Sequence, residues 1–524
     1  MSPNVLSPED ASPKKPIELL AVAILLLLIG TGAFMRFEKL DDKEFWHDES
    51  FTALVLSGRT TSEMKSELST KPCQISDLTK YRTINDSTSA GSILHSLGED
   101  EPGHAPLFYF IEWAFCSVLG TTPLTMRLTC ALISLLTLPV FYWLALETYQ
   151  SKQIALLTTA FASLSPLLIY YAQEARDYSL GVLLMTLSSA LLLAGLRTGK
   201  KAMWIGYTAA LAIGLYSWLF TTIIVAAHIL YVAITQPRGK TVWLPFAISI
   251  AVACLTFTPW LIFLSAHSND FKRAYDWVQA PITKSELLSV WLAIPYKAFA
   301  LFGFKTAKLS APLLLVTMLQ TAAVALAAIP FRNTKYIHIA VIVTWLVVFA
   351  GQDVLTEGAR SAVFRYQTAI IVSILFLFSA LIEFLWKKTR LLKGLALLVV
   401  TFTFGIELLS DNYMLNCKIW PDKAINLRFT LPVAEHLNKE PSAVLVVEEQ
   451  TINPTELLDL SFQTHPDCPI IFLSADKPQT IPAHSEILYL LNPSERLTTE
   501  LSSKYEISDS VDKFPYLKRA QKQQ

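Results

Sequence analysis

Residues 154–196 read IALLTTAFASLSPLLIYYAQEARDYSLGVLLMTLSSALLLAGL. Two uncharged runs, Ile154–Ala172 and Tyr178–Leu196, lie on either side of the polar turn Gln173–Asp177. Each run is long enough to cross a bilayer whose hydrocarbon core is about 30 Å thick. The stretch therefore predicts two membrane-spanning helices with a short polar connection between them.

Comparable apolar runs recur along the 524 residues. A single helix through Ala202–Pro237 would overshoot the bilayer at about 1.5 Å per residue, so we expect two spans with a break near Tyr216–Trp218. The last run is interrupted by Glu407. With this last run, Gly394–Ser410, and the two halves of Ala202–Pro237 included, the sequence predicts eleven spans. The spans not yet named are Leu19–Met35, Leu128–Leu146, Thr241–Asn269, Leu309–Phe331, Tyr336–Gln352 and Tyr366–Ile382.

The composition agrees with a membrane protein. Hydrophobic residues make up 52% of the chain and charged residues only 16%, against about 25% charged in soluble domains. The 43 basic residues are balanced by 43 acidic ones, which argues against a nucleic-acid-binding surface. Six cysteines are too few for a disulfide scaffold, and no Cys/His spacing is typical of a zinc site. The composition therefore excludes an ordinary soluble enzyme.

The basic residues of the short connections predict the orientation in the membrane. The opposite connections hold only Arg176, Arg360 and Arg365. We expect the basic-rich side to be cytoplasmic, with the N-terminus inside and the C-terminal region outside a plasma (inner) membrane. The basic residues on the rich side are Lys14, Lys15, Lys152, Arg197, Lys200, Lys201, Arg238, Lys240, Arg332, Lys335, Lys387, Lys388, Arg390 and Lys393.

Two further apolar segments, Ala105–Gly120 and Leu287–Phe304, contain internal charges and would disturb this pattern if both crossed the membrane. We expect them to be helices lying against the outer leaflet, the first of them within an extracytoplasmic loop of residues 36–127. The alternative is a protein with thirteen spans.

The chain is predicted to have three parts: a disordered cytoplasmic tail (1–16), a transmembrane domain (17–410) and a small extracytoplasmic α/β domain (411–524). The α/β prediction rests on three apolar runs of strand length and two intervening or following helical segments. Those segments are the strands Ala443–Val447, Pro469–Leu473 and Glu486–Leu491 and the helices Pro454–Leu460 and Ser494–Ser503. Whether Cys417 and Cys468 pair is left open by their spacing.

Four polar clusters lie at the outer ends of the predicted spans. They are Asp48–Glu49, His104 with its neighbours, Gln173–Tyr178, and Arg365–Tyr366; Arg127 opens the next span. A desolvated carboxylate can act as a general base, and an arginine fork can bind phosphate. Each cluster also has a simpler explanation: a solvated acidic pair, a turn at a helix start, a local ion-pair network, and arginines that reach lipid headgroups.

The side of the membrane weakens the simpler explanations. Basic residues otherwise avoid the outer face, yet these arginines lie beside acidic clusters. If the loops converge, the sequence predicts a site for an anionic lipid headgroup just above the outer leaflet.

These motifs resemble those of membrane-embedded GT-C glycosyltransferases, in the family 39 branch of protein O-mannosyltransferases and aminoarabinose transferases. The matching segments are Asp48–Glu49, His104–Tyr109, Arg127, Ser165–Tyr178 and Arg365–Tyr366. The resemblance covers residues 17–235 well and 350–370 loosely. In detail the sequence is most similar to a group of uncharacterised cyanobacterial members of this family. Ala105 replaces the usual proline after the histidine, a change that affects the helix start.

The resemblance implies a GT-C fold of about 11–13 transmembrane helices and an inverting transfer of a sugar from a polyprenyl-phosphate donor to an outer-face acceptor. It implies Asp48 as the catalytic base, with Glu49 supporting it or binding the acceptor. It also implies donor-phosphate or substrate contacts from His104, Arg127, Gln173, Glu174, Arg176, Tyr178, Arg365 and Tyr366. Some relatives use a divalent cation, and the sequence does not decide this here. The expected partners are the lipid-linked donor, a glycan, lipid or protein acceptor, and the membrane.

Other functions fit the residues less well. A transporter or lipid-linked-sugar flippase would place charges near the bilayer midplane, whereas the predicted spans are mostly free of charge. A polysaccharide polymerase or ligase would share the donor but not the early acidic pair. A degenerate relative would bind sugar-lipid without transferring it.

Overall fold

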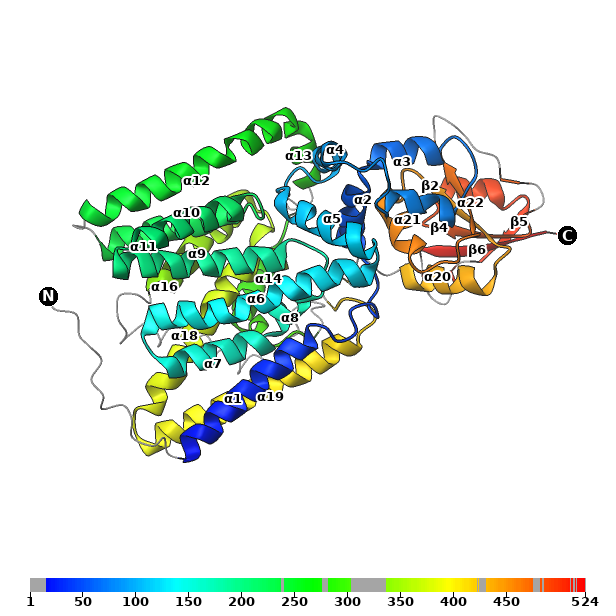
Figure 1. Ribbon diagram of the computed structural model, residues 1–524. Helices are drawn as coiled ribbons and strands as arrows, with labels where there is room; N and C mark the ends of the chain where they lie inside the picture. The colour runs from blue at the N-terminus through cyan, green and yellow to red at the C-terminus, as the bar shows by residue number, and fades with distance from the viewer. Residues whose placement is uncertain are drawn as a thin grey trace.

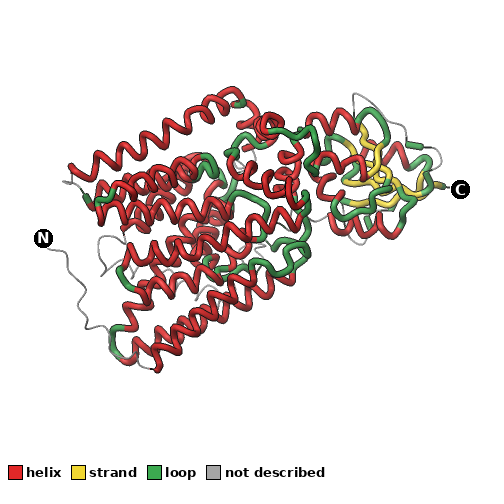
Figure 2. The backbone as a smooth tube through the Cα atoms, viewed as in Figure 1, coloured by secondary structure: helices red, strands yellow, loops and turns green. Residues whose placement is uncertain are grey.

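The computed structural model describes residues 16–236, 240–275, 281–302, 336–421, 423, 430–474 and, with short gaps, 481–523. Helices form a bundle that makes up most of the molecule, and a smaller domain lies at one end of it (Figure 1). The strands are confined to this smaller domain (Figure 2). Helix α1 begins at the opposite end of the bundle (Figure 1).

The centre of the bundle is formed by helices from the middle of the chain. Helix α6 packs against α7 and α9, α9 packs against α10, and α7 packs against α1. The bundle helices are α1 (Pro16–Met35), α6 (Pro123–Tyr149), α7 (Lys152–Leu164), α8 (Pro166–Ala172), α9 (Tyr178–Thr198), α10 (Lys201–Leu215), α11 (Thr221–Thr235), α12 (Lys240–Ala266), α16 (Tyr336–Trp345), α17 (Gly351–Thr356), α18 (Thr368–Trp386) and α19 (Arg390–Asn416).

The helices lie where the apolar runs predict them. Within the described residues, six helices are long and apolar enough to cross a membrane, and α7 with α8 forms a seventh span bent by 58°. The predicted spans at Leu19–Met35 and within Ala202–Pro237 lie on the shorter helices α1, α10 and α11, with the expected break between Leu215 and Thr221. The predicted span Leu309–Phe331 lies outside the described residues, so the total of eleven stays a prediction.

The bend between α7 and α8 has a local cause. Pro166 is the first residue of α8, and it lacks the N–H that would continue the α7 hydrogen-bond ladder. The backbone of Ser165 is extended, and its hydroxyl donates a hydrogen bond to the carbonyl of Ala298 (2.8 Å). The bend sets the direction in which α8 presents the polar turn that follows it.

The two segments predicted to lie against the outer leaflet contain the helices α5 (Leu107–Leu119) and α14 (Lys284–Lys297). These helices contain 13 and 14 residues, which gives lengths of about 20 Å. The hydrocarbon core is about 30 Å thick, but α10 and α11 are only 15 residues long, so length alone does not separate surface helices from spans and the choice between eleven and thirteen spans stays a prediction.

The sheet combines residues from the first loop and from the C-terminal region. The first loop contains α2 (His47–Ser57), α3 (Thr61–Leu68), β1 (Cys73–Gln74), a 3-10 helix (Ile75–Tyr81) and α4 (Ala90–Asp100). Outside this loop, the short helix α13 (Ser268–Tyr275) follows α12. The C-terminal region contains α20 (Thr430–Lys439), β2 (Val444–Glu448), α21 (Pro454–Ser461), β3 (Pro469–Leu473), β4 (Ile487–Leu491), α22 (Glu495–Leu501), β5 (Tyr505–Ile507) and β6 (Leu517–Lys522). The strand order is β1-β3-β2-β4-β6-β5.

Strands β2, β3 and β4 pair in parallel, as expected for strands separated by helices, and they match the three predicted strands. The structure differs from the predicted self-contained domain of residues 411–524. Helix α19 continues to Asn416, and β1 pairs antiparallel with β3 through Cys73 opposite Ile470. A two-residue strand has too little pattern to be recognised in a sequence.

The first loop and the C-terminal region also share a hydrophobic core. Leu54, Leu68 and Leu78 of the loop lie in one cluster with Leu445 and Leu457. The loop that carries Asp48 is therefore packed onto the C-terminal domain. Cys417 and Cys468 are both free thiols, which settles the pairing that the sequence left open.

Candidate active site

The site is built on the first turn of α2. Trp46 precedes the helix, and its backbone N–H donates to Glu49 Oε2 (3.3 Å). Asp48 and Glu49 both lie in this first turn, where carboxylates are favoured by the unpaired N–H groups and the positive end of the helix dipole. The two carboxylates then have different surroundings: Glu49 is fully buried, whereas the Asp48 side chain is 15% exposed.

Glu49 forms a fully buried ion pair with Arg127 of α6. Arg127 donates from Nε to Glu49 Oε1 (2.8 Å) and from Nη2 to Oε2 (2.6 Å). Its remaining donors go to the carbonyls of Leu40, Lys43 and Glu44. All five guanidinium N–H groups are used in this way. The contacts thus favour a structural role for Arg127, in place of the phosphate-binding role that the sequence predicts.

The turn between α8 and α9 is held by the first loop. Gln173 donates to the carbonyls of Met35 (2.9 Å) and Glu38 (2.8 Å), and its Oε1 accepts from Lys43 (2.9 Å). The N–H of Ala175 donates to Glu49 Oε1 (3.0 Å). The predicted substrate residue Gln173 is therefore used entirely in holding the turn.

Arg176 reaches from this turn to α2 and to the start of α5. Its Nη1 lies 2.6 Å from Glu101 Oε2 and donates to the backbone carbonyl of Asp48 (2.9 Å). Its Nη2 lies 2.8 Å from His104 Nε2, and His104 Nδ1 lies 3.1 Å from Asp177 Oδ2. These contacts fit a neutral His104 that donates to Asp177 and accepts from Arg176, so His104 orients the arginine.

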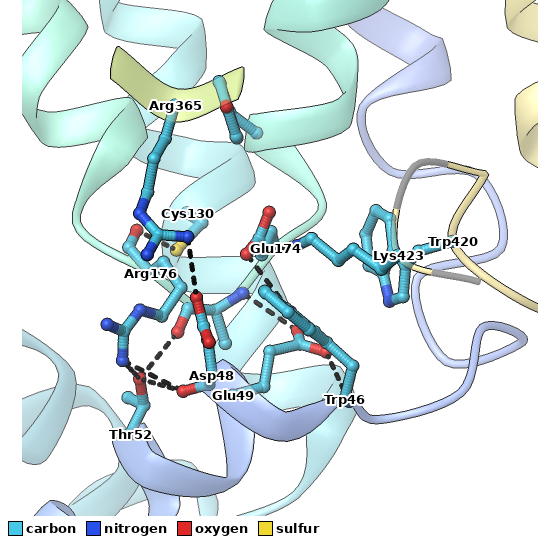
Figure 3. Close-up of polar contacts among 12 residues, drawn as sticks. Trp46, Asp48, Glu49, Thr52, Cys130, Glu174, Arg176, Arg365, Trp420 and Lys423 are labelled. Carbon is cyan, nitrogen blue, oxygen red and sulfur yellow. Dashed lines mark hydrogen bonds and ion pairs between the residues drawn. The ribbon is translucent and has the colours of Figure 1, made fainter. Parts of the chain in front are cut away.

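Arg365 approaches Asp48 from a different part of the chain. It lies in a 3-10 turn (Phe364–Gln367) before α18, and its Nη1 is 3.5 Å from Asp48 Oδ2. Figure 3 shows Arg365 and Arg176 arriving at Asp48 from two directions. Burial raises the pKa of Asp48, but the charges of Arg365, Arg176 and Lys423 outweigh it and lower the pKa to about 2. Asp48 is therefore ionised at neutral pH.

The two predicted tyrosines have different environments. The Tyr178 hydroxyl is buried and has no hydrogen-bond partner within the part of the chain that the structure describes. Tyr366 packs against Phe220 (ring centroids 4.6 Å apart) and Phe349 (5.4 Å), and its carbonyl accepts from the Trp345 indole (2.7 Å). Tyr178 has an unused polar atom to offer a substrate, whereas Tyr366 supports the turn that carries Arg365.

Glu174 has a partner that sequence reasoning missed. Its Oε1 accepts from the Trp46 indole (3.1 Å) and lies 2.6 Å from Lys423 Nζ. Lys423 belongs to the region that the family resemblance does not cover, and no motif surrounds it, so only the fold brings it to the site. Burial raises the pKa of Glu174 to about 7, although the charge of Lys423 opposes this rise.

The raised pKa of Glu174 predicts a pH-dependent stability. The folded-state pKa of Glu174, about 7, lies above the ordinary value of 4.5. The contribution of this group to the free energy of unfolding is therefore complete below pH 4.5 and is lost as the pH rises through the folded-state pKa. Between about pH 5 and pH 8 we expect the melting temperature of the wild type to fall relative to that of Glu174→Gln. Thermal unfolding in detergent measures this, and parallel curves would contradict it.

No metal site is evident in the described part of the chain, where no group of three His, Cys, Asp or Glu side chains is placed to hold an ion. The polar atoms that surround Asp48 come mainly from arginine and lysine, which repel cations.

Known proteins share both sequence features and the fold. Residues 103–263 match the family model for dolichyl-phosphate-mannose-protein mannosyltransferase, a segment that includes His104, Arg127 and the turn before α9. No curated protein sequence matches the chain. Among solved structures, ArnT from Cupriavidus metallidurans in the apo state is similar with a TM-score of 0.57 at 13% identity, over 96% of this chain and 98% of that one.

The chain has the GT-C fold, and about a third of it matches a glycosyltransferase family model. The same Cupriavidus metallidurans ArnT bound to undecaprenyl phosphate is similar at a TM-score of 0.55 and 12% identity, over 97% and 98% of the two chains. The archaeal oligosaccharyltransferase AglB from Archaeoglobus fulgidus shows a weaker likeness, with a TM-score of 0.49 at 9% identity over 89% and 69%. The predicted GT-C fold is confirmed.

Proposed function

We propose that this GT-C glycosyltransferase moves a sugar from a polyprenyl-phosphate donor to an acceptor at the outer face of the membrane, with inversion and with Asp48 as the general base. The observation that carries the proposal is the partly exposed Asp48 carboxylate, which lies 3.5 Å from Arg365, while Arg176 donates to the backbone carbonyl of the same residue. The family model named for a dolichyl-phosphate-mannose enzyme and the undecaprenyl phosphate bound to the ArnT relative support a lipid-phosphate donor.

In the proposed reaction an acceptor hydroxyl attacks the anomeric carbon. The new bond forms between the acceptor oxygen and that carbon, the bond from the carbon to the phosphate oxygen breaks, and the electron pair stays on the phosphate. The acceptor proton passes to Asp48. One displacement of this kind inverts the configuration at the anomeric carbon.

The arginines have two connected roles in this proposal. Arg365 Nη1 lies 3.5 Å from Asp48 Oδ2, and the buried Nε of Arg176 has no hydrogen-bond partner among the described residues. Both guanidinium groups can therefore stabilise the charge that develops on the leaving phosphate. A bound phosphate also offsets their effect on Asp48 and raises its pKa, so that the carboxylate becomes a better base when the donor is present.

The other predicted residues support this arrangement. Glu49 and Arg127 hold the start of α2, His104 orients Arg176, and Tyr178 contributes a buried hydroxyl without a partner. The outer-face location rests on the distribution of basic residues in the sequence. The acceptor can be a glycan, a lipid or a protein.

The proposal is tested by incubating the purified protein with radiolabelled polyprenyl-phosphate sugars and a membrane extract as the acceptor source. We expect the wild type to consume one donor. Arg365→Met is expected to lose about 10²- to 10³-fold in kcat, the typical loss of a group that stabilises transition-state charge. Arg365→Lys keeps the charge without the planar fork and should lose less.

Two outcomes would count against the proposal. If the folded wild type neither consumes nor binds any donor in the panel, the assignment of a lipid-phosphate donor fails. If Arg365→Met matches the wild type, the phosphate-stabilising role of Arg365 fails. Arg496→Met is the matched control, because Arg496 is exposed on the C-terminal domain.

A further inference from the structure

The segment after α19 contacts the candidate site directly. The Trp420 indole donates to the carbonyl of Glu44 (3.0 Å), in the loop that precedes α2. On the other side of the C-terminal region, the Thr455 hydroxyl of α21 lies 3.0 Å from Nδ1 of His47, the residue before Asp48. The C-terminal region therefore contacts both the loop before α2 and the first residue of α2.

Lys423 is the charged residue that this segment brings to the site. Its ammonium lies 2.6 Å from Glu174 Oε1. The same ammonium lies 3.2 Å from the ring centroid of Trp46, 4.9 Å from that of Tyr170 and 5.1 Å from that of Trp420. A carboxylate together with aromatic faces is a favourable environment for a largely buried ammonium group.

A continuous set of contacts leads from Lys423 to Asp48. Lys423 and the Trp46 indole share the same oxygen of Glu174. Trp46 is the residue that precedes α2, and Asp48 is the second residue of that helix. Figure 3 shows Lys423 and Glu174 beside Trp46, on the opposite side of Asp48 from Arg176. Fixing the Trp46 indole thus fixes the start of the helix that carries Asp48.

We propose that Lys423 is a positioning residue for sugar transfer, which acts by holding Glu174 and Trp46 and so fixes Asp48 beside Arg365. This inference rests on the proposed function. It makes the C-terminal region a required part of the transferase site, in which a residue of that region sets the geometry of a base from the first loop. A role in acceptor docking alone would not place an ammonium on Glu174.

The experiment compares Lys423→Met, Lys423→Arg, Glu174→Gln and the double variant Lys423→Met/Glu174→Gln in the donor assay. Lys418→Met is the matched control, because Lys418 is an exposed lysine of the same segment. A misplaced catalytic group typically costs up to about 10²-fold. We therefore expect Lys423→Met to lower kcat by about tenfold or more, with KM for the donor changed by less than about threefold.

Two results identify positioning rather than general support of the fold. The double variant should be no slower than Lys423→Met alone, because both changes break the same set of contacts. Lys423→Arg retains a cation at Glu174 and should recover most of the activity. Lys423→Met leaves Glu174 without its cation and can fold poorly; the double variant avoids this, and a thermal melt of each variant checks it.

The inference is overturned if folded Lys423→Met and the double variant both have wild-type kcat. It is also overturned if the loss appears mainly in KM and adds fully to that of Glu174→Gln, since Lys423 would then bind the donor directly. Asp48→Asn, assayed in parallel, separates the two proposals. If Asp48→Asn is inactive while Lys423→Met is fully active, only the role of Lys423 fails.

Discussion

Replacing Asp48 with asparagine is expected to lower sugar transfer by at least about 10²-fold, the low end for loss of a general base. The amide keeps the shape of the side chain but cannot accept the acceptor proton. The change also removes the negative charge opposite Arg365, 3.5 Å away, so donor binding should be retained or strengthened. Single-turnover transfer and donor-binding measurements on the same preparation check both expectations.

Asp41→Asn is the matched control for this prediction. Asp41 is an exposed acid in the same loop, and its substitution should leave transfer unchanged. Full activity of a folded Asp48→Asn variant would exclude Asp48 as the base. Glu49 would be a poor substitute in that case, because its carboxylate is fully buried and bound by Arg127 and the Ala175 N–H.

The second large effect is expected on stability. Arg127→Met leaves the buried Glu49 carboxylate unpaired and removes the donors to three backbone carbonyls. Breaking a buried ion pair from one side typically costs about 3–5 kcal/mol. We expect a strongly lowered melting temperature and poor recovery from the membrane, measured by thermal unfolding in detergent.

Arg197→Gln provides the comparison. Arg197 also forms a bidentate pair, with Glu147, but its side chain is 52% exposed. Pairs exposed to solvent are worth about 1 kcal/mol or less, so this variant should melt close to the wild type. The double variant Glu49→Gln/Arg127→Met should be more stable than the sum of its single changes, because neither charge is left alone. If Arg127→Met and Arg197→Gln lowered the melting temperature equally, this result would contradict the structural role of Arg127.

The transmembrane helices and the main strands could be predicted because their signals are local. The uncharged runs Ile154–Ala172 and Tyr178–Leu196, for example, form the helices α7, α8 and α9. In a bilayer, a helix satisfies its own backbone hydrogen bonds, so the run itself contains the information. The break near Tyr216–Trp218 and the strands β2, β3 and β4 could be predicted for the same reason, because their signals are the length and composition of a single segment.

The candidate residues could be selected from the sequence, but their roles could not. Arg127, Arg176 and Arg365 look alike as arginines at the ends of spans, and the family resemblance implies a phosphate contact for all three. In the structure Arg127 uses every donor within the protein, whereas the Arg176 Nε has no partner among the residues that the structure describes and Arg365 faces Asp48. The number of guanidinium N–H donors that each arginine keeps for a ligand depends on neighbouring residues that are distant in sequence.

The sequence by itself determined that this chain is a multi-span membrane protein with acidic and basic clusters at one side. Tertiary structure alone decided which groups meet. Asp48 and Arg365 are 317 positions apart, β1 joins the sheet of the C-terminal region, and Lys423 reaches Glu174 from a segment without a motif. Hydropathy and helical length act within a segment, whereas ion pairs and hydrogen bonds act over a few ångströms between segments that only the packed fold brings together.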